Sequence, residues 1–431
     1  MKYAIVGTGS RHAMFRRAIT ETHAHDNELV ALCDSNPVRL GVSAALVPEQ
    51  PGNGIATYAA AEFDRMLLEQ QPDTVIVTTP DYLHHDYIVR ALRAGRNVMT
   101  EKPMTVDLAK LKAILDAQAE TGKSVTVTFN YRYTPARTQI KDLLMSGAIG
   151  DITQVDFRWY LDRVHGADYF RRWHRYKDKS GGLLVHKSTH HFDLLNWWVA
   201  STPKAVSANG KRVFYTPEMA AKLGLSDHSD RCHTCPVFDR CDYRLDLAAD
   251  PALNALYLEA EDEDGYFRDR CVFADDITIE DTMQVQVRYE NDVFLNYTLC
   301  AYSPWEGLEV KFHGTKGELT HRHVEVHGVF GGVRDHAHDE SMTTTLHLHG
   351  SHPEQLQVWE GSGDHGGADP VMLGYLFEPS SMEPDRYARA SSHREGAWSI
   401  LTGIAANEAI ATGTAIDIDA LLARAGIKLG R

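Results

Sequence analysis

The chain opens with MKYAIVGTGSRH, residues 1–12, in which an apolar β-forming run enters a turn with two glycines. Residues 13–24 then suit a helix. A strand, a Gly-x-Gly turn and a helix in this order are typical of the phosphate-binding turn of a dinucleotide fold, where the helix start offers amide N–H groups. The residues of this turn that we expect to contact a dinucleotide are Gly7, Gly9, Ser10, Arg11 and His12. His12 replaces the third glycine of the usual fingerprint, so the motif alone is equally compatible with an ordinary strand-to-helix turn.

Strand and helix signals continue to alternate through the first 128 residues. Such alternation predicts parallel βαβ units and therefore a doubly wound Rossmann domain over residues 1–128. The expected strands are residues 28–33, 74–78, 97–100 and 124–129, and the expected helices are residues 61–70, 84–94 and 105–121.

From residue 129 to residue 431 the pattern changes to period two, which predicts an α+β domain with an open, mostly antiparallel sheet and helices on one face. The expected strands are residues 152–159, 283–289, 293–299, 308–312 and 317–320. An acidic, cysteine-containing insertion interrupts the pattern at about residues 215–275. Residues 327–366, rich in glycine and histidine, are expected to form loops, and residues 391–412 a C-terminal helix.

Composition narrows the class of protein. The 431 residues carry a formal net charge of -15, with 43% hydrophobic residues. A chain this acidic is not expected to bind nucleic acid or an anionic membrane. It has no apolar run of the roughly 18 residues needed to cross a bilayer, and its start lacks the layout of a signal peptide. We therefore expect a cytoplasmic protein with reduced thiols.

Asp34, at the end of the second expected strand, indicates which dinucleotide binds. A carboxylate there can accept the ribose hydroxyls and would repel a 2′-phosphate, so it favours NAD over NADP. Arg11 and Arg39 lie close enough in sequence to keep NADP open, and Asp34 could instead be a turn former before Pro37.

Several spaced motifs together resemble the Gfo/Idh/MocA family of oxidoreductases. They are the glycine turn, TPDYLH at residues 79–84, EKP at residues 101–103, and Gly181-Gly followed by HHFD at residues 190–193. The resemblance implies reversible hydride transfer between a nicotinamide and a secondary alcohol of a sugar, inositol or glycoside, with a homodimer or homotetramer as the assembly. It also implies cofactor contacts from Thr79, Pro80, His84 and Glu101.

The resemblance further implies that Lys102 is the catalytic lysine and His190 the catalytic histidine. An imidazole titrates near neutral pH, so His190 can take and return the alcohol proton. If the segment is helical, His186 shares a face with His190, and we expect it to bind substrate hydroxyls or to orient His190. Many relatives have an aspartate at the position of His186. Lys102 could instead be a surface lysine in a turn, and Asp193 is expected to be structural.

Aromatic, basic and acidic residues before the Gly-Gly motif suit recognition of a polyol, with rings against the sugar face and charges on its hydroxyls. A half-exposed helix with an aromatic anchor explains the same residues equally well. With Lys102 and His186, the expected substrate contacts are Arg132, His165, Tyr169, Trp173, His174 and Lys187.

Four cysteines gather in the insertion: Cys232, Cys235, Cys241 and Cys271. As thiolates they could bind structural zinc or an iron–sulfur cluster, although the spacing is not that of a common zinc ribbon. Free buried thiols and disulfides remain alternatives.

Two other functions fit the same residues. Some relatives are NAD-using glycoside hydrolases, in which transient oxidation of the sugar allows its glycosidic bond to be eliminated. A regulatory module that only senses NAD is the third possibility, against which the intact Lys102 and His190 count.

Overall fold

The computed structural model describes residues 1–48, 54–326, 339–362 and 364–430. The chain forms two compact units, and each contains segments that are distant in sequence. Unit 1 comprises Met1–Thr134, Pro251–Phe267 and Gly361–Ala397, and unit 2 comprises Pro135–Asp250, Arg268–Glu360 and Trp398–Arg431. Part of the insertion therefore belongs to the first unit.

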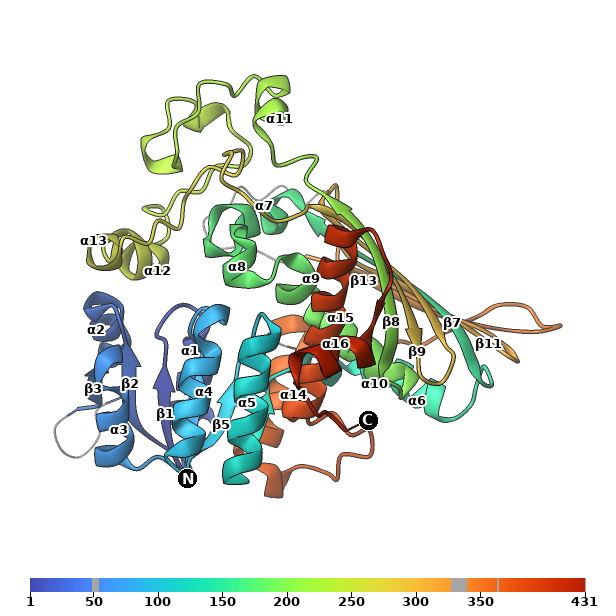
Figure 1. Ribbon diagram of the computed structural model, residues 1–431, viewed down its shortest axis with the longest axis horizontal. Helices are drawn as coiled ribbons and strands as arrows, with labels where there is room; N and C mark the ends of the chain where they lie inside the picture. Colours follow the sequence, from blue (N-terminus) through green and yellow to red (C-terminus); the bar gives the residue numbers. More distant parts are fainter. Residues whose placement is uncertain (49–53, 327–338, 363, 431) are drawn as a thin grey trace. The chain divides into compact units, whose positions relative to one another are not determined.

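Unit 1 contains the predicted Rossmann sheet, with six parallel strands in the order β3-β2-β1-β4-β5-β6 (Figure 1). Its strands are β1 (Lys2–Val6), β2 (Glu28–Asp34), β3 (Ala56–Ala59), β4 (Thr74–Val77), β5 (Asn97–Thr100) and β6 (Val125–Val127). Every residue of β4 is buried, as a strand covered on both faces requires.

The main helices of unit 1 are α1 (His12–Arg17), α2 (Pro37–Ala45), α3 (Phe63–Gln70), α4 (His84–Arg93), α5 (Leu108–Thr121) and α14 (Asp364–Phe377). The first expected helix is shorter than predicted, since α1 gives way to a π-helical turn over Ala18–Thr22. Gly122 ends α5 with a φ of 64°, a conformation that glycine adopts without steric cost.

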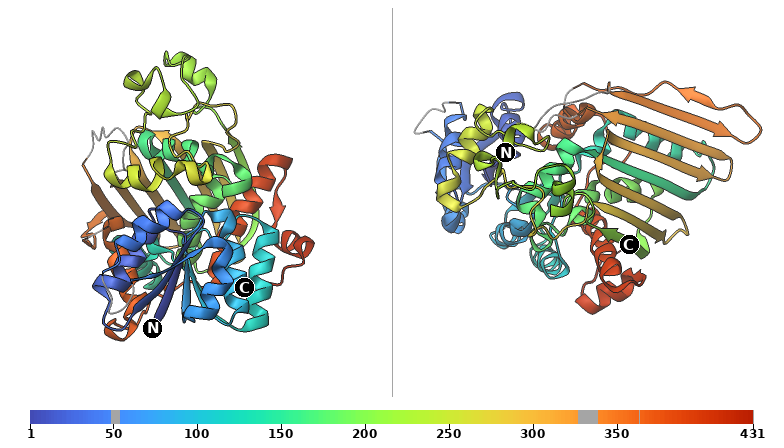
Figure 2. Two further views of the ribbon diagram at one scale, coloured as in Figure 1. Left: turned by 90° about the vertical axis from the view of Figure 1, so that its left-hand side faces the viewer. Right: turned by 90° about the horizontal axis from the view of Figure 1, so that it is seen from above.

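Unit 2 contains a sheet of nine strands in the order β14-β13-β12-β11-β7-β10-β9-β8-β15 (Figure 2). Its strands are β7 (Ile152–Asp162), β8 (Pro203–Lys211), β9 (Thr282–Tyr289), β10 (Phe294–Ser303), β11 (Glu306–Gly314), β12 (Gly317–Glu325), β13 (Ser341–Leu348), β14 (Glu354–Leu356) and β15 (Ile416–Asp417). Neighbouring strands are antiparallel except β7 and β10, and the predicted hairpin pairs Phe294 with Arg288.

One face of this sheet is covered by helix α10 (Ser188–Val199). Trp159 of β7 stacks on His191 of α10 with ring centroids 4.3 Å apart, and Phe312 of β11 packs edge-on against Trp198. The intervening side chains point to the other face and form ion pairs such as Arg158 with Glu309. The remaining helices of the unit are α6 (Pro135–Met145), α7 (Arg163–Arg171), α8 (Lys177–Ser180), α9 (Leu183–His186), α11 (Pro217–Lys222), α16 (Ile418–Ala425) and most of α15 (His393–Thr412).

The expectation of loops over residues 327–366 is wrong for part of that range. Residues 341–348 and 354–356 pair as β13 and β14, and α14 begins at Asp364, whereas residues 327–338 lie outside the described residues. The consecutive threonines at 343–345 favour a strand because β-branched side chains fit a pleated surface. None of the helices in the described ranges is long and apolar enough to cross a bilayer.

Candidate active site

The glycine turn of unit 1 lies where the order of the parallel sheet reverses, between β1 and β4. In such sheets ligands bind beyond the carboxyl ends of the strands at this point. Gly7 has a φ of 93°, and a Cβ there would lie 2.6 Å from the backbone nitrogen of Thr79. Only glycine therefore allows the turn after β1 to lie this close to the turn after β4, which brings the expected residues Thr79 and Pro80 beside it.

The start of α1 carries His12 in place of the third fingerprint glycine. Nδ1 of His12 lies 2.5 Å from the carbonyl oxygen of Gly9, and the side chain is buried. Burial lowers the pKa of His12, although the Gly9 carbonyl opposes the shift, so the ring is neutral at physiological pH. The imidazole therefore braces the turn.

Asp34 ends β2 and is hydrogen-bonded to the same turn. Its Oδ2 accepts from the amide of Thr8 at 2.5 Å and from the Thr8 hydroxyl at 2.9 Å, while Oδ1 accepts from the amide of Asn36 at 2.8 Å. These bonds fix the carboxylate of Asp34 at the end of the strand, where its oxygens can also accept hydrogen bonds from the hydroxyls of a ribose.

Glu101 connects the glycine turn to Lys102. Its Oε1 accepts from Nε of Arg11 at 2.7 Å, and its Oε2 accepts from the amide of Lys102 at 3.2 Å. Arg11 also lies 3.8 Å from Asp369 of α14, which in turn accepts from the side chain of Asn130 at 2.7 Å. Asp369 is a residue that sequence reasoning missed, because nothing local links it to the glycine turn.

His84, at the start of α4, connects two more turns at this edge. Its Nδ1 lies 2.8 Å from the carbonyl oxygen of Pro103 and its Nε2 lies 2.8 Å from that of Thr79. The ring is buried, and burial lowers its pKa, although the two carbonyls oppose the shift. His84 therefore holds the turn that carries Lys102, whose side chain is partly exposed, against the turn after β4.

In unit 2 the structure gathers five of the expected substrate residues into one cluster of rings, which we call the ring cluster: His165, Tyr169, Trp173, His174 and His186. The ring of His174 stacks on Trp173 with centroids 3.7 Å apart and meets His186 edge-on at 4.1 Å. The cluster joins residues of α7, the turn after it and the end of α9, so these expected residues lie together in space.

A buried carboxylate supports the ring cluster from β11. Oε1 of Glu306 lies 2.6 Å from Nδ1 of His165, and the hydroxyl of Tyr169 lies 2.9 Å from Nε2 of the same ring. Asp162 caps α7 through the amides of Val164 and His165. Burial and the nearby Glu306 raise the pKa of Asp162. Sequence reasoning missed Glu306, which follows β10 across a short turn.

His190 is buried and is the third residue of α10, which Lys187 separates from α9. His186 ends α9, so the two histidines occupy successive helices rather than one continuous helix. Lys187, between them, is buried with its Nζ 4.8 Å from the centroid of Trp159. Burial lowers the pKa of Lys187, and Glu306 and Glu325 oppose that shift.

Arg132 belongs to unit 1, where it is buried in a 3-10 turn over Asn130–Tyr133. Its Nη1 donates to the carbonyl oxygen of Ala388 at 3.4 Å, and its charge contributes to the lowered pKa of Glu395 after burial, which acts in the opposite direction. Arg132 and the ring cluster therefore belong to different units.

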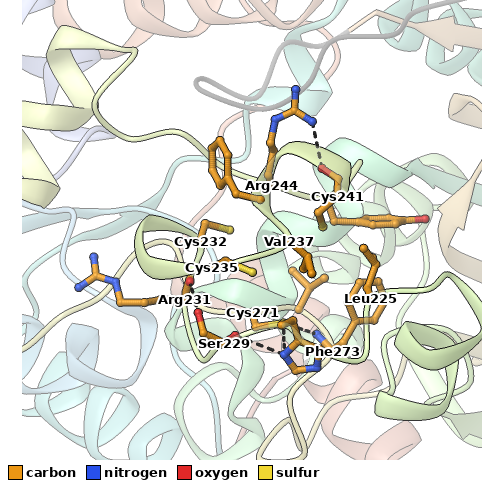
Figure 3. A pocket seen from close by; sticks show the side chains of 14 residues that line it. Leu225, Ser229, Arg231, Cys232, Cys235, Val237, Cys241, Arg244, Cys271 and Phe273 are labelled. Atoms are coloured by element: carbon orange, nitrogen blue, oxygen red, sulfur yellow. Dashed lines mark hydrogen bonds between the residues drawn. The ribbon is translucent and has the colours of Figure 1, made fainter.

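The four insertion cysteines, all in unit 2, line one pocket together with His228 and Phe273 (Figure 3). Sγ of Cys271 lies 3.4 Å from Nδ1 of His228, and Sγ of Cys232 accepts from the amide of Leu245 at 3.4 Å. All six cysteines are free, so no disulfide forms. Among the described residues no three His, Cys, Asp or Glu side chains are arranged to hold a metal ion, and the expected zinc or iron–sulfur site at Cys232, Cys235, Cys241 and Cys271 gains no support.

The chain is similar in sequence to known proteins. Residues 1–129 match the model of the oxidoreductase family, NAD-binding Rossmann fold, and residues 141–418 match that of the oxidoreductase family, C-terminal alpha/beta domain. The chain is 34% identical to the oxidoreductase YteT of Bacillus subtilis over 410 residues, which cover 92% of this chain and 93% of that protein.

More distant relatives have named substrates. The inositol 2-dehydrogenase of Rhizobium meliloti is 26% identical over 48% of this chain and 58% of its own length, and the D-glucoside 3-dehydrogenase of Escherichia coli is 32% identical over 35% and 41%.

The fold is shared with solved structures. The aldose-aldose oxidoreductase of Caulobacter crescentus, complexed with glycerol, aligns with a TM-score of 0.62 at 18% identity, over 97% of this chain and 99% of that one. The chain, with its NAD-binding domain and its C-terminal α/β domain, belongs to the Gfo/Idh/MocA family of oxidoreductases.

Proposed function

We propose that the protein is an NAD-dependent dehydrogenase that transfers a hydride between the nicotinamide and a secondary alcohol of a sugar, inositol or glycoside. The observation that carries the proposal is the strand edge of unit 1. There Gly7 admits close approach at the sheet's reversal point, Asp34 is fixed at the end of β2, and Lys102 follows β5. These residues would bring the cofactor and an ammonium group to the edge at which parallel sheets bind ligands, which supports the proposal.

The bound dinucleotide would supply the hydride acceptor. Gly7, Ser10, Asp34 and the turn at Thr79 would hold it. Lys102 would hold the alcohol oxygen and stabilise its developing negative charge, and His190 would take the hydroxyl proton. His186 would belong to substrate recognition, because the ring cluster holds it against His174.

The ring cluster supports the choice of a polyol. Its imidazole and phenol groups offer donors and acceptors beside flat apolar ring faces, the combination that sugars and inositols require. The named relatives that act on inositol and on a glucoside agree in substrate class.

Turnover tests the proposal. The purified protein is mixed with NAD and a panel of sugars, inositols and glycosides, and reduced nicotinamide is followed by absorbance. We expect at least one substrate, and we expect Lys102→Ala to lower kcat by about 100-fold or more while NAD still binds. Lys112→Ala is the matched control, because Lys112 pairs with Asp116 on the surface. Full activity of Lys102→Ala would refute the role of Lys102.

The same panel of substrates distinguishes a dehydrogenase from an NAD-using glycoside hydrolase, which would regenerate its NAD in each cycle. If glycosides are cleaved without accumulation of reduced cofactor, the protein is a glycoside hydrolase that oxidises its sugar only transiently.

We further propose a homodimer or homotetramer, testable by light scattering. A cytoplasmic location, with which six free thiols agree, is testable by cell fractionation.

A further inference from the structure

A segment of the insertion is built into unit 1 beside the expected cofactor residues. Residues 251–267 belong to this unit, and they form α12 (Pro251–Leu253), a π-helical turn over Asn254–Leu258, and α13 (Glu261–Asp264). We call them the strap. The rest of the insertion belongs to unit 2.

Two sets of hydrogen bonds attach the strap to the Rossmann unit. The hydroxyl of Tyr257 accepts from the amide of Ser10 at 3.1 Å and lies 2.8 Å from its hydroxyl. The side chain of Asn36, which is fully buried and caps α2, donates to the carbonyl oxygen of Ala260 at 2.8 Å. The strap is thus fixed both at the glycine turn and at the residues that follow β2.

At its end the strap places a carboxylate on Arg39. Nη2 of Arg39 donates to Oδ2 of Asp264, and Nε of Arg39 lies 4.0 Å from Oδ1 of Asp34. Asp264 is oriented by the amide of Tyr266, which donates to its Oδ1 at 3.2 Å. Arg39 is only 8% exposed, and its Nη1 is buried with no hydrogen-bond partner among the described residues.

The charges of these three side chains distinguish the two cofactors. Asp34 and Asp264 together outnumber the single cation of Arg39, so the group carries a net negative charge. A ribose 2′-hydroxyl can bond to such a group, whereas a 2′-phosphate would be repelled by both carboxylates. The guanidinium of Arg39 is a group that could bind the 2′-phosphate of NADP, but it is already paired with the carboxylate of Asp264.

We propose that Asp264 is a specificity-determining residue: by neutralising Arg39 beside Asp34, it makes the protein select NAD over NADP. The inference rests on the proposed function, in which the dinucleotide ribose binds at the end of β2. The residue that determines specificity would then come from a segment more than 200 residues beyond the glycine turn in sequence. The hydrogen bond from Asn36 to Ala260 holds this segment in place.

Cofactor affinities, measured by isothermal titration calorimetry of the full chain, test this inference without any need for turnover. We expect the native protein to bind NAD more tightly than NADP. Asp264→Asn keeps the side-chain shape and the Tyr257 and Asn36 bonds, and should tighten NADP binding by at least about tenfold while leaving NAD affinity within about threefold.

Three variants control for general effects. Asp262→Asn removes an equal charge from the same helix but from an exposed residue, and should change NADP affinity by less than about threefold. Asp264→Glu keeps the charge and should keep the preference for NAD. Arg39→Ala combined with Asp264→Asn should lose the gain in NADP affinity, because the phosphate then has no freed cation to bind.

An unchanged NADP affinity in Asp264→Asn, with native NAD affinity and melting temperature, would overturn the inference and leave Asp34 as the determinant. Tighter binding of NADP than NAD by the native protein would also overturn it. If Asp264→Asn does not fold, a relaxed preference in Asp264→Glu would count against the role of charge. Failure of the native protein to bind either nucleotide would instead refute the proposed function and this inference with it.

Discussion

Nδ1 of His165 lies 2.6 Å from Oε1 of Glu306, and both side chains belong to unit 2. A neutral imidazole that donates from Nδ1 must accept at Nε2, and there the hydroxyl of Tyr169 lies at 2.9 Å. The buried carboxylate therefore sets the tautomer of His165 and turns the Tyr169 O–H toward it. The Tyr169 hydroxyl thereby has a fixed direction within the ring cluster.

This relationship predicts that Glu306→Gln impairs substrate recognition. The neutral amide weakens the hold on the His165 tautomer, and loss of a charge-assisted hydrogen bond costs about 1.5–3 kcal/mol. We expect kcat/KM for the polyol to fall by about tenfold to 100-fold, mainly through KM, with unchanged NAD affinity. Glu309→Gln on the same strand is the control, because Glu309 pairs with arginines on the outer face of the sheet. Equal losses of kcat/KM in Glu306→Gln and Glu309→Gln would contradict a role of Glu306 in fixing His165.

His84 offers a test in unit 1. Because its ring bonds to the carbonyls of both Thr79 and Pro103, His84→Ala should loosen the turn that carries Lys102. Loss of these two bonds in a buried site is expected to destabilise the protein by about 2–4 kcal/mol and to lower kcat more than it weakens NAD binding.

Urea unfolding and steady-state kinetics measure the two effects of His84→Ala. His85→Ala is the matched control at the neighbouring, half-buried position. A variant with lower stability but native kcat would show that His84 does not position Lys102.

Local sequence patterns predicted the elements well, and for a physical reason. Runs such as Thr74–Val77 are buried on both faces, and the strand Thr282–Tyr289 alternates because only one of its faces is buried. Each pattern follows directly from the environment of the strand.

The partners of the site could not be predicted in the same way. Glu306, Asp369 and Asp264 each contact a residue that the sequence analysis singled out, but the separations along the chain are about 140 to 360 residues, and no local period or motif marks them. The strap is an example. Its composition is that of an acidic surface helix, and only the folded structure shows that the Tyr257 hydroxyl accepts a hydrogen bond from the amide of Ser10.

The cysteine pocket predicts a slow, pH-dependent reaction with iodoacetamide. Burial raises the pKa of Cys271 to about 12, although the amide of Phe273 opposes the shift. Only the thiolate reacts, so at pH 8 the folded protein should label at Cys271 at least about 100-fold more slowly than an unperturbed cysteine with a pKa of about 8.5.

The labelling rate of Cys271 should increase with pH up to the point at which the protein unfolds. Mass spectrometry of proteolytic peptides measures it, and the urea-unfolded chain, in which all cysteines should react, is the reference. Rapid labelling of folded Cys271 at pH 8 would contradict a buried, protonated thiol.

Asp168 predicts how stability depends on acid. Burial alone would raise the pKa of its carboxyl, but Arg268, Arg172, Arg171 and His174 surround it and hold that pKa well below its usual range. Arg172 donates to it at 3.1 Å and Arg268 lies at 3.5 Å. Because the folded pKa is depressed, the stabilisation is fully present above the unfolded pKa of about 3.9 and is lost as the pH falls below it.

Asp168→Asn should therefore lower the free energy of unfolding by about 3–5 kcal/mol at pH 7, since it leaves buried arginines without their counter-charge. The difference between the native protein and the variant should shrink as the pH falls below about 4, because the carboxyl of the unfolded chain then takes up a proton while that of the folded protein, with its depressed pKa, does not. Urea unfolding at a series of pH values measures this difference. Asp178→Asn, an exposed aspartate on the neighbouring α8, should change stability by less than about 0.5 kcal/mol. A deficit in Asp168→Asn that stayed constant down to acid pH would show that packing, and not charge, is the contribution of Asp168.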